Sequence, residues 1–242
     1  MRPILWLVLA LAVTSCGSAA SDTTPEGDLR VLFIGNSLTE VNDLPGLVSG
    51  IAGSAGGPRV TVEAVDFGGA SLEDHWNRTE ARDAIERGGW DVVVLQQGPS
   101  ALPESRVLLL DYVGRFAELI HAAGARPALY MVWPQLYREG DWDAVTESYA
   151  AAARSVDGLI LPAGEALREA RRRKPALELF QGDGFHPTPT GSYLAALVIY
   201  AGLTGRDVTG LVERTAPATL PAADFEVIEA AAAWAIQQHG NP

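Results

Sequence analysis

Short apolar runs alternate with segments of helical spacing along most of this sequence. The runs cover residues 29–35, 59–67, 90–97, 126–133 and 158–162. They are rich in aliphatic residues and nearly continuous, which is typical of strands covered on both faces in a parallel sheet. Helical spacing is found over 44–54, 79–87, 104–123, 142–155, 164–174, 190–203 and 222–239. The alternation predicts an α/β fold, a three-layer α/β/α sandwich with a doubly wound parallel sheet of about five strands.

The first 28 residues differ from this pattern. Arg2 precedes an apolar run over 4–13 that is too short to span a bilayer as a helix. Val13-Thr14-Ser15-Cys16 then resembles the lipobox of bacterial lipoproteins, which implies a signal peptide over 1–15 and lipid on Cys16. Residues 16–28 become a flexible tether and 29–240 the folded domain. We expect an exported lipoprotein anchored in the cell envelope; the alternative is an ordinary signal peptide with a chance cysteine.

Charge and composition exclude several other classes of protein. The formal net charge of −12 argues against DNA or RNA as a partner, because a phosphate backbone binds a basic face. The single cysteine excludes an intrachain disulfide. His75, His121 and His239 show no ligand spacing, so no metal and no other cofactor is expected. The basic run over 171–174 lies at a predicted helix end, where we expect it to be solvated.

Ser37 directly follows the first apolar run, in Gly35-Asn36-Ser37-Leu38. Ligands in doubly wound folds bind beyond the carboxyl ends of the strands, so a serine here displays its hydroxyl at the functional edge. A second interpretation is equally open at this point, because Ser37 and Glu40 have the spacing of a capping box. Ser37 is thus either a nucleophile or a helix cap.

A second group of polar residues precedes the helix predicted at 190–203. Asp183 lies three positions before His186 on a loop that contains glycine. A carboxylate so placed can hold one ring nitrogen of the histidine and leave the other to take a proton from a serine. Serine needs such a base, because its hydroxyl is a poor nucleophile at neutral pH. The pair therefore favours the nucleophile interpretation of Ser37.

These two segments resemble the first and last blocks of the SGNH (GDSL-like) hydrolase superfamily. Gly35-Asn36-Ser37-Leu38 is similar to Gly-Asp-Ser-Leu, with Asn36 in the aspartate position, and Asp183-Gly184-Phe185-His186 matches Asp-x-x-His. The resemblance covers 29–203. It implies a serine ester hydrolase that forms an acyl-enzyme, with Ser37 as nucleophile, His186 as base and Asp183 as the orienting acid.

The middle blocks of the superfamily match less closely. Gly69 in Phe67-Gly68-Gly69-Ala70-Ser71 fits the oxyanion glycine, and Gly68 is the alternative. The third block usually supplies an asparagine, but this chain has Gln96-Gln97-Gly98-Pro99-Ser100, similar to carbohydrate acetylesterase branches. The resemblance implies an oxyanion hole of the Ser37 and Gly69 N–H groups and the Gln97 amide. Ser100, which stands in the asparagine position, is the other candidate.

The substrate is less constrained than the reaction. The envelope location and the Gln-Gly block favour short acyl esters, acetyl first, on a small substrate or a glycan. Asn36, Ser100 and Trp133 are candidate contacts, with Trp133 either stacking on a sugar ring or packing inside; His75 and Trp76 are similar candidates. The alternatives are a lysophospholipase or thioesterase of the same superfamily, a non-catalytic lipoprotein that binds envelope glycans, and a flavodoxin-like binding module.

Overall fold

Five parallel strands form one sheet in the part of the chain that the computed structural model describes, residues 27–240. The strands are β1 (Leu29–Gly35), β2 (Val60–Asp66), β3 (Val92–Leu95), β4 (Arg126–Tyr130) and β5 (Leu159–Leu161). Their order is β2-β1-β3-β4-β5, and each neighbouring pair is parallel. The predicted α/β fold with a five-stranded parallel sheet is confirmed.

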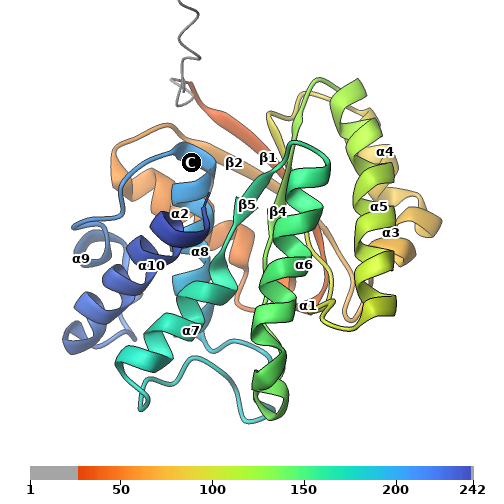
Figure 1. Cartoon of the computed structure of the whole chain (residues 1–242). Helices are drawn as coiled ribbons and strands as arrows, with labels where there is room; N and C mark the ends of the chain where they lie inside the picture. The colour runs from red at the N-terminus through yellow and green to blue at the C-terminus, as the bar shows by residue number, and fades with distance from the viewer. Residues whose placement is uncertain (1–26, 241–242) are drawn as a thin grey trace, which may run out of the picture.

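Helices cover both faces of the sheet and complete the three layers (Figure 1). One face carries α2 (Leu44–Ala55), α7 (Ala163–Arg173), α8 (Pro189–Thr204) and α10 (Phe225–His239). The other carries α3 (Leu72–Arg78), α4 (Glu80–Glu86), α5 (Pro103–Ala122) and α6 (Trp142–Ser155). The short elements are α1 (Ser37–Glu40), η1 (Leu136–Asp141), α9 (Val212–Thr215) and η2 (Ala222–Asp224).

The strand order reverses direction between β1 and β3, which lie side by side in the middle of the sheet. Connections leave these two strands toward opposite sides, so a crevice opens beyond their carboxyl ends. The chain reaches this crevice at Ser37, directly after β1, and at Gln97, shortly after β3. The fold therefore places the two polar segments of the sequence at the site where a doubly wound sheet binds ligands.

The core lies between the sheet and its helices. Every residue of β3 is buried, as its unbroken apolar run predicts, whereas in the edge strand β2 only Val60 is buried and the other positions are partly or fully exposed. The helix α8 is buried along almost its whole length because the sheet, α2, α7 and α10 surround it. Its N-terminus begins just after the Asp183–His186 loop, so this buried helix fixes where that loop lies.

Two details differ from the sequence prediction. The apolar run 126–133 pairs in the sheet only as far as Tyr130, although Met131, Val132 and Trp133 remain buried. The helix α3 was not predicted, because its polar residues show no clear apolar stripe. It begins at a capping box in which the Ser71 hydroxyl accepts from Asp74 N, and the Asp74 carboxylate accepts from Ser71 N.

The predicted signal peptide over 1–15 and the predicted lipid on Cys16 lie outside the described residues. Within 27–240, no helix combines the length and apolar character that crossing a membrane requires.

Candidate active site

Ser37 is the first residue of α1, at the point where β1 ends. The cap of this helix is Asn36, whose Oδ1 accepts a hydrogen bond from Leu38 N at 3.1 Å. The capping-box interpretation of Ser37 is therefore wrong: the neighbouring asparagine caps the helix, and the serine hydroxyl faces another partner. A Cβ on Gly35 would lie 2.2 Å from a side-chain oxygen of α1, so only glycine fits at this turn.

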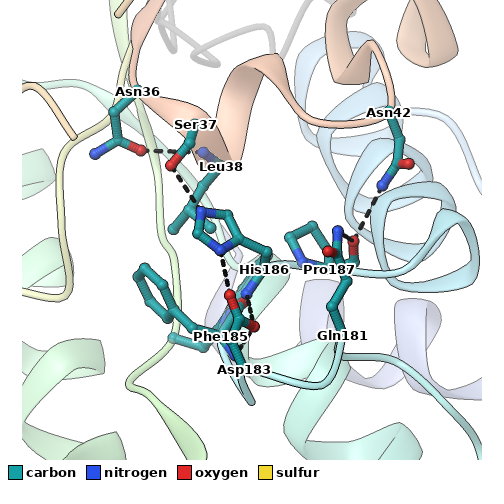
Figure 2. A network of polar contacts seen from close by, with 10 residues as sticks. Asn36, Ser37, Leu38, Asn42, Gln181, Asp183, Phe185, His186 and Pro187 are labelled. Atoms are coloured by element: carbon teal, nitrogen blue, oxygen red, sulfur yellow. Dashed lines mark hydrogen bonds and ion pairs between the residues drawn. The ribbon is translucent and has the colours of Figure 1, made fainter. Parts of the chain in front are cut away.

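The partner of Ser37 is His186. Its Nε2 lies 3.0 Å from Ser37 Oγ, and its Nδ1 lies 2.5 Å from Asp183 Oδ2 (Figure 2). The other carboxylate oxygen, Asp183 Oδ1, accepts from the backbone N–H groups of Phe185 at 2.9 Å and of His186 at 3.0 Å. The structure thus brings together, in one hydrogen-bonded row, the three residues that the two sequence blocks supply.

In the hydrogen-bonded row of Ser37, His186 and Asp183, each donor and acceptor can be assigned. The hydrogen bond from His186, together with the N–H of Phe185, holds the pKa of the Asp183 carboxyl below its usual value, so the group is a carboxylate that only accepts. His186 Nδ1 must then carry the hydrogen, and Nε2 is left to accept from the Ser37 hydroxyl. This arrangement can remove a proton from Ser37 as its oxygen attacks an electrophile.

The loop that carries His186 is held from several sides. Pro187 O accepts from Asn42 Nδ2 at 3.1 Å and from Gln181 Nε2 at 3.0 Å (Figure 2). Asn42 follows α1, so one bond ties the histidine loop directly to the segment that carries Ser37. These contacts fix the distance between His186 and Ser37.

Trp133 also holds this loop, and its predicted contact with a substrate is wrong. The side chain is 0% exposed, and its Nε1 donates to Phe185 O at 2.9 Å. The indole ring therefore fills the core beneath the histidine loop and does not reach the cavity beside Ser37. Of the two interpretations open for this aromatic residue, packing is the one that applies.

His75 and Trp76 do not line the cavity beside Ser37 either. His75 is buried, and its Nε2 lies 2.7 Å from Gly35 O. Burial lowers the pKa of His75, so the ring is neutral and donates to that carbonyl. Trp76 is half-buried and packs edge-on against Phe116. Within 27–240, no three histidine, cysteine or carboxylate side chains are grouped so that they could hold a metal ion.

Gln96 connects the loops around the site, a role that the sequence did not indicate. Its Oε1 accepts from Asn36 N and from Thr39 Oγ1, both at 2.8 Å. Its Nε2 donates to Asn36 Oδ1 at 3.0 Å and to Gln97 O at 2.6 Å. Asn36 Nδ2 in turn donates to Ala70 O at 3.0 Å. Asn36 was predicted to contact substrate. Its polar atoms form hydrogen bonds that connect the loops following β1, β2 and β3.

Gln97 and Ser100, the two candidates for the third oxyanion donor, are bonded to each other. Gln97 Oε1 accepts from Leu72 N at 3.1 Å, and Gln97 Nε2 donates to Ser100 Oγ at 2.8 Å. Ser100 Oγ can pass its own hydrogen to Gly98 O, 3.1 Å away. Since a primary amide has two N–H groups, Gln97 retains a second hydrogen beside the one given to Ser100. Tyr149, buried behind this loop, donates to Gln97 O at 2.7 Å.

Gly69 lies on the loop that follows β2 and has a φ of 73°, in the left-handed region that favours glycine. It lines the cavity beside Ser37, as do Ala70 and Ser71, whereas the alternative candidate Gly68 is not among the lining residues. The geometry thus favours Gly69 over Gly68 as the glycine that faces a ligand.

A cavity of about 410 Å³ opens beside Ser37. It is lined by Asn36, Ser37, Gly69, Ala70, Ser71, Gln97, Gly98, Pro99, Ser100, Ala101, Leu102, Ser105, Leu108, Pro134, Gln135, Arg138, Asp141 and Phe185. The sequence indicated the first half of this set through its motifs. It did not indicate Leu102, which precedes α5, Leu108 on α5, or Arg138 and Asp141 on η1. Their only signal in the sequence is their place shortly after the third and fourth apolar runs.

Comparison with known proteins gives matches among solved structures. A protein from Slackia heliotrinireducens described as a candidate SGNH hydrolase is 30% identical, with a TM-score of 0.61, and the match covers 74% of this chain and 100% of that one. A DUF4886 family protein from Bacteroides uniformis is 20% identical, with a TM-score of 0.70, over 87% of this chain and 95% of that one. A catalytic mutant of an acetylxylan esterase from Geobacillus stearothermophilus is 18% identical, with a TM-score of 0.56, over 74% and 97%. Neither a known family profile nor a curated protein matches the sequence.

Proposed function

This chain belongs to the SGNH hydrolases, and on that premise we propose that it is a carboxylic ester hydrolase whose catalytic triad is Ser37, His186 and Asp183. The observation that carries the proposal is the position of His186, whose two ring nitrogens lie 3.0 Å from Ser37 Oγ and 2.5 Å from Asp183 Oδ2. In this mechanism His186 accepts the Ser37 proton while Oγ attacks the ester carbonyl, and then returns it to the departing alcohol. Water, activated by His186, releases the acyl group from Ser37.

The negative charge on the carbonyl oxygen of the intermediate requires hydrogen-bond donors. We propose the Ser37 N–H at the start of α1, the Gly69 N–H and the second N–H of Gln97 Nε2. Each such donor contributes typically about 2.7–4 kcal/mol to transition-state stabilisation. What supports this set is that the three residues line one cavity and that Gln97 is held by Leu72 N and Ser100 Oγ.

For the substrate we propose short acyl esters, with acetyl groups on carbohydrate as the narrower candidate. The Gln96-Gln97-Gly98 loop and the similarity in fold to an acetylxylan esterase support it. A second candidate is an ester with a longer acyl chain, as in a thioesterase or lysophospholipase. Leu102 and Leu108, which give the cavity one apolar wall, favour it.

One experiment tests the triad against a non-catalytic glycan-binding protein. The purified protein is treated with a fluorophosphonate probe and assayed with p-nitrophenyl esters from acetate to octanoate. We expect labelling and turnover in the wild type, and loss of both in Ser37→Ala, while circular dichroism shows an unchanged fold. A wild type that neither labels nor turns over any ester would contradict the proposal.

We also propose that the chain is exported and anchored to the membrane through lipid on Cys16. Its support is the lipobox-like segment Val13-Thr14-Ser15-Cys16. Cys16→Ala should move the protein from the membrane fraction to the soluble fraction of the expressing cells. An unchanged membrane fraction would refute the lipid anchor and leave the catalytic proposal untouched.

A further inference from the structure

The cavity beside Ser37 has one charged wall. Of the lining residues found within 27–240, only Arg138 and Asp141 carry ionised side chains, and both belong to η1. The two side chains form an ion pair with each other. The remaining lining consists of glycine, serine, amide, proline and apolar side chains, so this pair is a distinct chemical feature of the cavity.

The ion pair is not explained by the stability of the neighbouring helix. Asp141 occupies the N-cap position of α6, where an aspartate usually accepts a hydrogen bond from the first turn. Its side chain makes no such bond and faces Arg138 instead. The backbone of Arg138 leaves helical geometry at φ −122° and ψ 28°, which interrupts η1 at this residue. Both side chains remain about one-third exposed and are accessible to a ligand.

The position of η1 indicates which part of the substrate the Arg138–Asp141 ion pair contacts. Leu136 N donates to Gly184 O at 2.9 Å, so η1 rests directly on the loop that carries Asp183 and His186. In the proposed mechanism His186 protonates the departing alcohol, which must therefore lie next to the histidine loop. The charged wall then contacts the alcohol. The apolar wall, which begins beyond the Gln97–Ser100 loop at Leu102, is left for the acyl group.

We infer that Arg138 and Asp141 form an alcohol-binding subsite that selects an ester whose alcohol carries two or more hydroxyl groups. This inference rests on the proposed function. A guanidinium only donates hydrogen bonds and a carboxylate only accepts them, whereas a hydroxyl does both. Two neighbouring hydroxyls can therefore bond to both members of the pair. A single ionic group would be attracted by one member and repelled by the other.

The test compares two acetate esters with the same number of carbons in the alcohol. 1-Monoacetylglycerol has two free hydroxyls on a three-carbon alcohol, and propyl acetate has none. We expect the wild type to prefer monoacetylglycerol by about tenfold or more in kcat/KM, mainly through KM, since hydrogen bonds to charged groups have this magnitude. Arg138→Met and Asp141→Asn should each reduce that preference to about twofold or less, and Arg138→Lys should restore part of it.

Glu139→Gln is the matched control. Glu139 lies on the same η1, pairs with Arg171 and does not line the cavity, so this variant should keep the wild-type preference. Equal kcat/KM for the two esters in the wild type, or a preference that both cavity variants keep, would overturn the inference. Failure of the proposed function would look different, because the wild type would then hydrolyse neither ester nor p-nitrophenyl acetate. Melting temperatures show whether each variant is folded, and the two variants at different positions provide independent tests.

Discussion

His186 Nε2 lies 3.0 Å from Ser37 Oγ, although 149 positions separate the two residues along the chain. The contact exists because β1, in the middle of the sheet, ends just before Ser37, and α8, packed against α2, begins just after His186. The local sequence around Ser37 or His186 cannot by itself determine the distance between their side chains. This distance depends on the packing of the whole sheet and its helices, so the site is a product of the fold.

Asp183→Asn should reduce kcat on the order of 10⁴-fold with little change in KM. An asparagine amide can donate to Nδ1, which would put the hydrogen of His186 on Nε2 and remove the acceptor for the Ser37 hydroxyl. The carboxylate is ionised in the wild type, since its pKa lies below the usual value. Steady-state kinetics with p-nitrophenyl acetate measure the effect.

Asp207→Asn is the matched control for this variant. Asp207 also accepts from a backbone N–H, that of Thr209 at 3.0 Å, and its pKa is lowered by that bond, but it does not line the cavity beside Ser37. It should keep wild-type kinetics. An Asp183→Asn variant as active as this control would show that His186 does not need the carboxylate.

Gln96→Leu should lower kcat by about 10- to 100-fold, more than it raises KM. The amide holds Asn36 through Asn36 N and Oδ1, and the Asn36 side chain in turn bonds to Leu38 N, next to Ser37, and to Ala70 O. A leucine leaves these groups unpaired and lets the nucleophile and the Gly69 loop shift. Loss of the buried hydrogen bonds should also reduce the free energy of unfolding by about 1–3 kcal/mol.

Thr204→Val is the matched control for Gln96→Leu, because it should lower the stability of the protein without moving the catalytic residues. Thr204 is fully buried, and its hydroxyl donates to Tyr200 O at 2.7 Å near the end of α8, opposite the catalytic loops. This variant should be destabilised without a change in kcat. Similar kcat values for the Gln96 and Thr204 variants at equal folded fractions would rule out a positioning role for Gln96.

The sequence predicts the fold and the main residues of the site for a physical reason. Strands buried on both faces give unbroken apolar runs, and parallel strands present their carboxyl ends at one edge. Ser37 and His186 could therefore be assigned to the same edge without coordinates. The position of Asp183, three residues before His186, indicated its orienting role, and the motifs around these residues also resemble the first and last blocks of a known family.

Residues whose roles depend on side-chain direction could not be predicted this way. Trp133 could face a ligand or the core, and only its burial and its hydrogen bond to Phe185 O, on the histidine loop, decide for the core. Gln96 and Gln97 are adjacent in sequence, yet one bonds to the Asn36 turn and the other lines the cavity. Arg138 belongs to no sequence motif. Its position at the cavity depends on the kink within η1, which the sequence does not indicate.

Asp74→Asn should destabilise the protein by roughly 0.5–1 kcal/mol at pH 7, and by less at pH 3. The Asp74 carboxylate accepts from Ser71 N at 2.9 Å, and this bond with that of the Ser71 hydroxyl lowers the pKa of the carboxyl from its usual value near 3.8. Stabilisation from a lowered pKa is complete above the unfolded-state pKa and is lost as the pH falls through the folded-state pKa. Urea unfolding of wild type and variant at the two pH values measures the difference. A gap that widens at pH 3 would contradict this sign.

Leu108→Ser should shift the acyl preference of the enzyme, whereas Val107→Ser should not. Leu108 lines the cavity and is 39% exposed, while its neighbour Val107 is 64% exposed and does not line it. Each methylene that an apolar wall removes from water contributes about 0.8 kcal/mol. The ratio of kcat/KM for p-nitrophenyl hexanoate to that for the acetate should therefore fall about fivefold in Leu108→Ser. If the two serine variants change this ratio equally, or if neither does, the acyl group does not lie against α5, and the assignment of the two cavity walls is reversed or wrong.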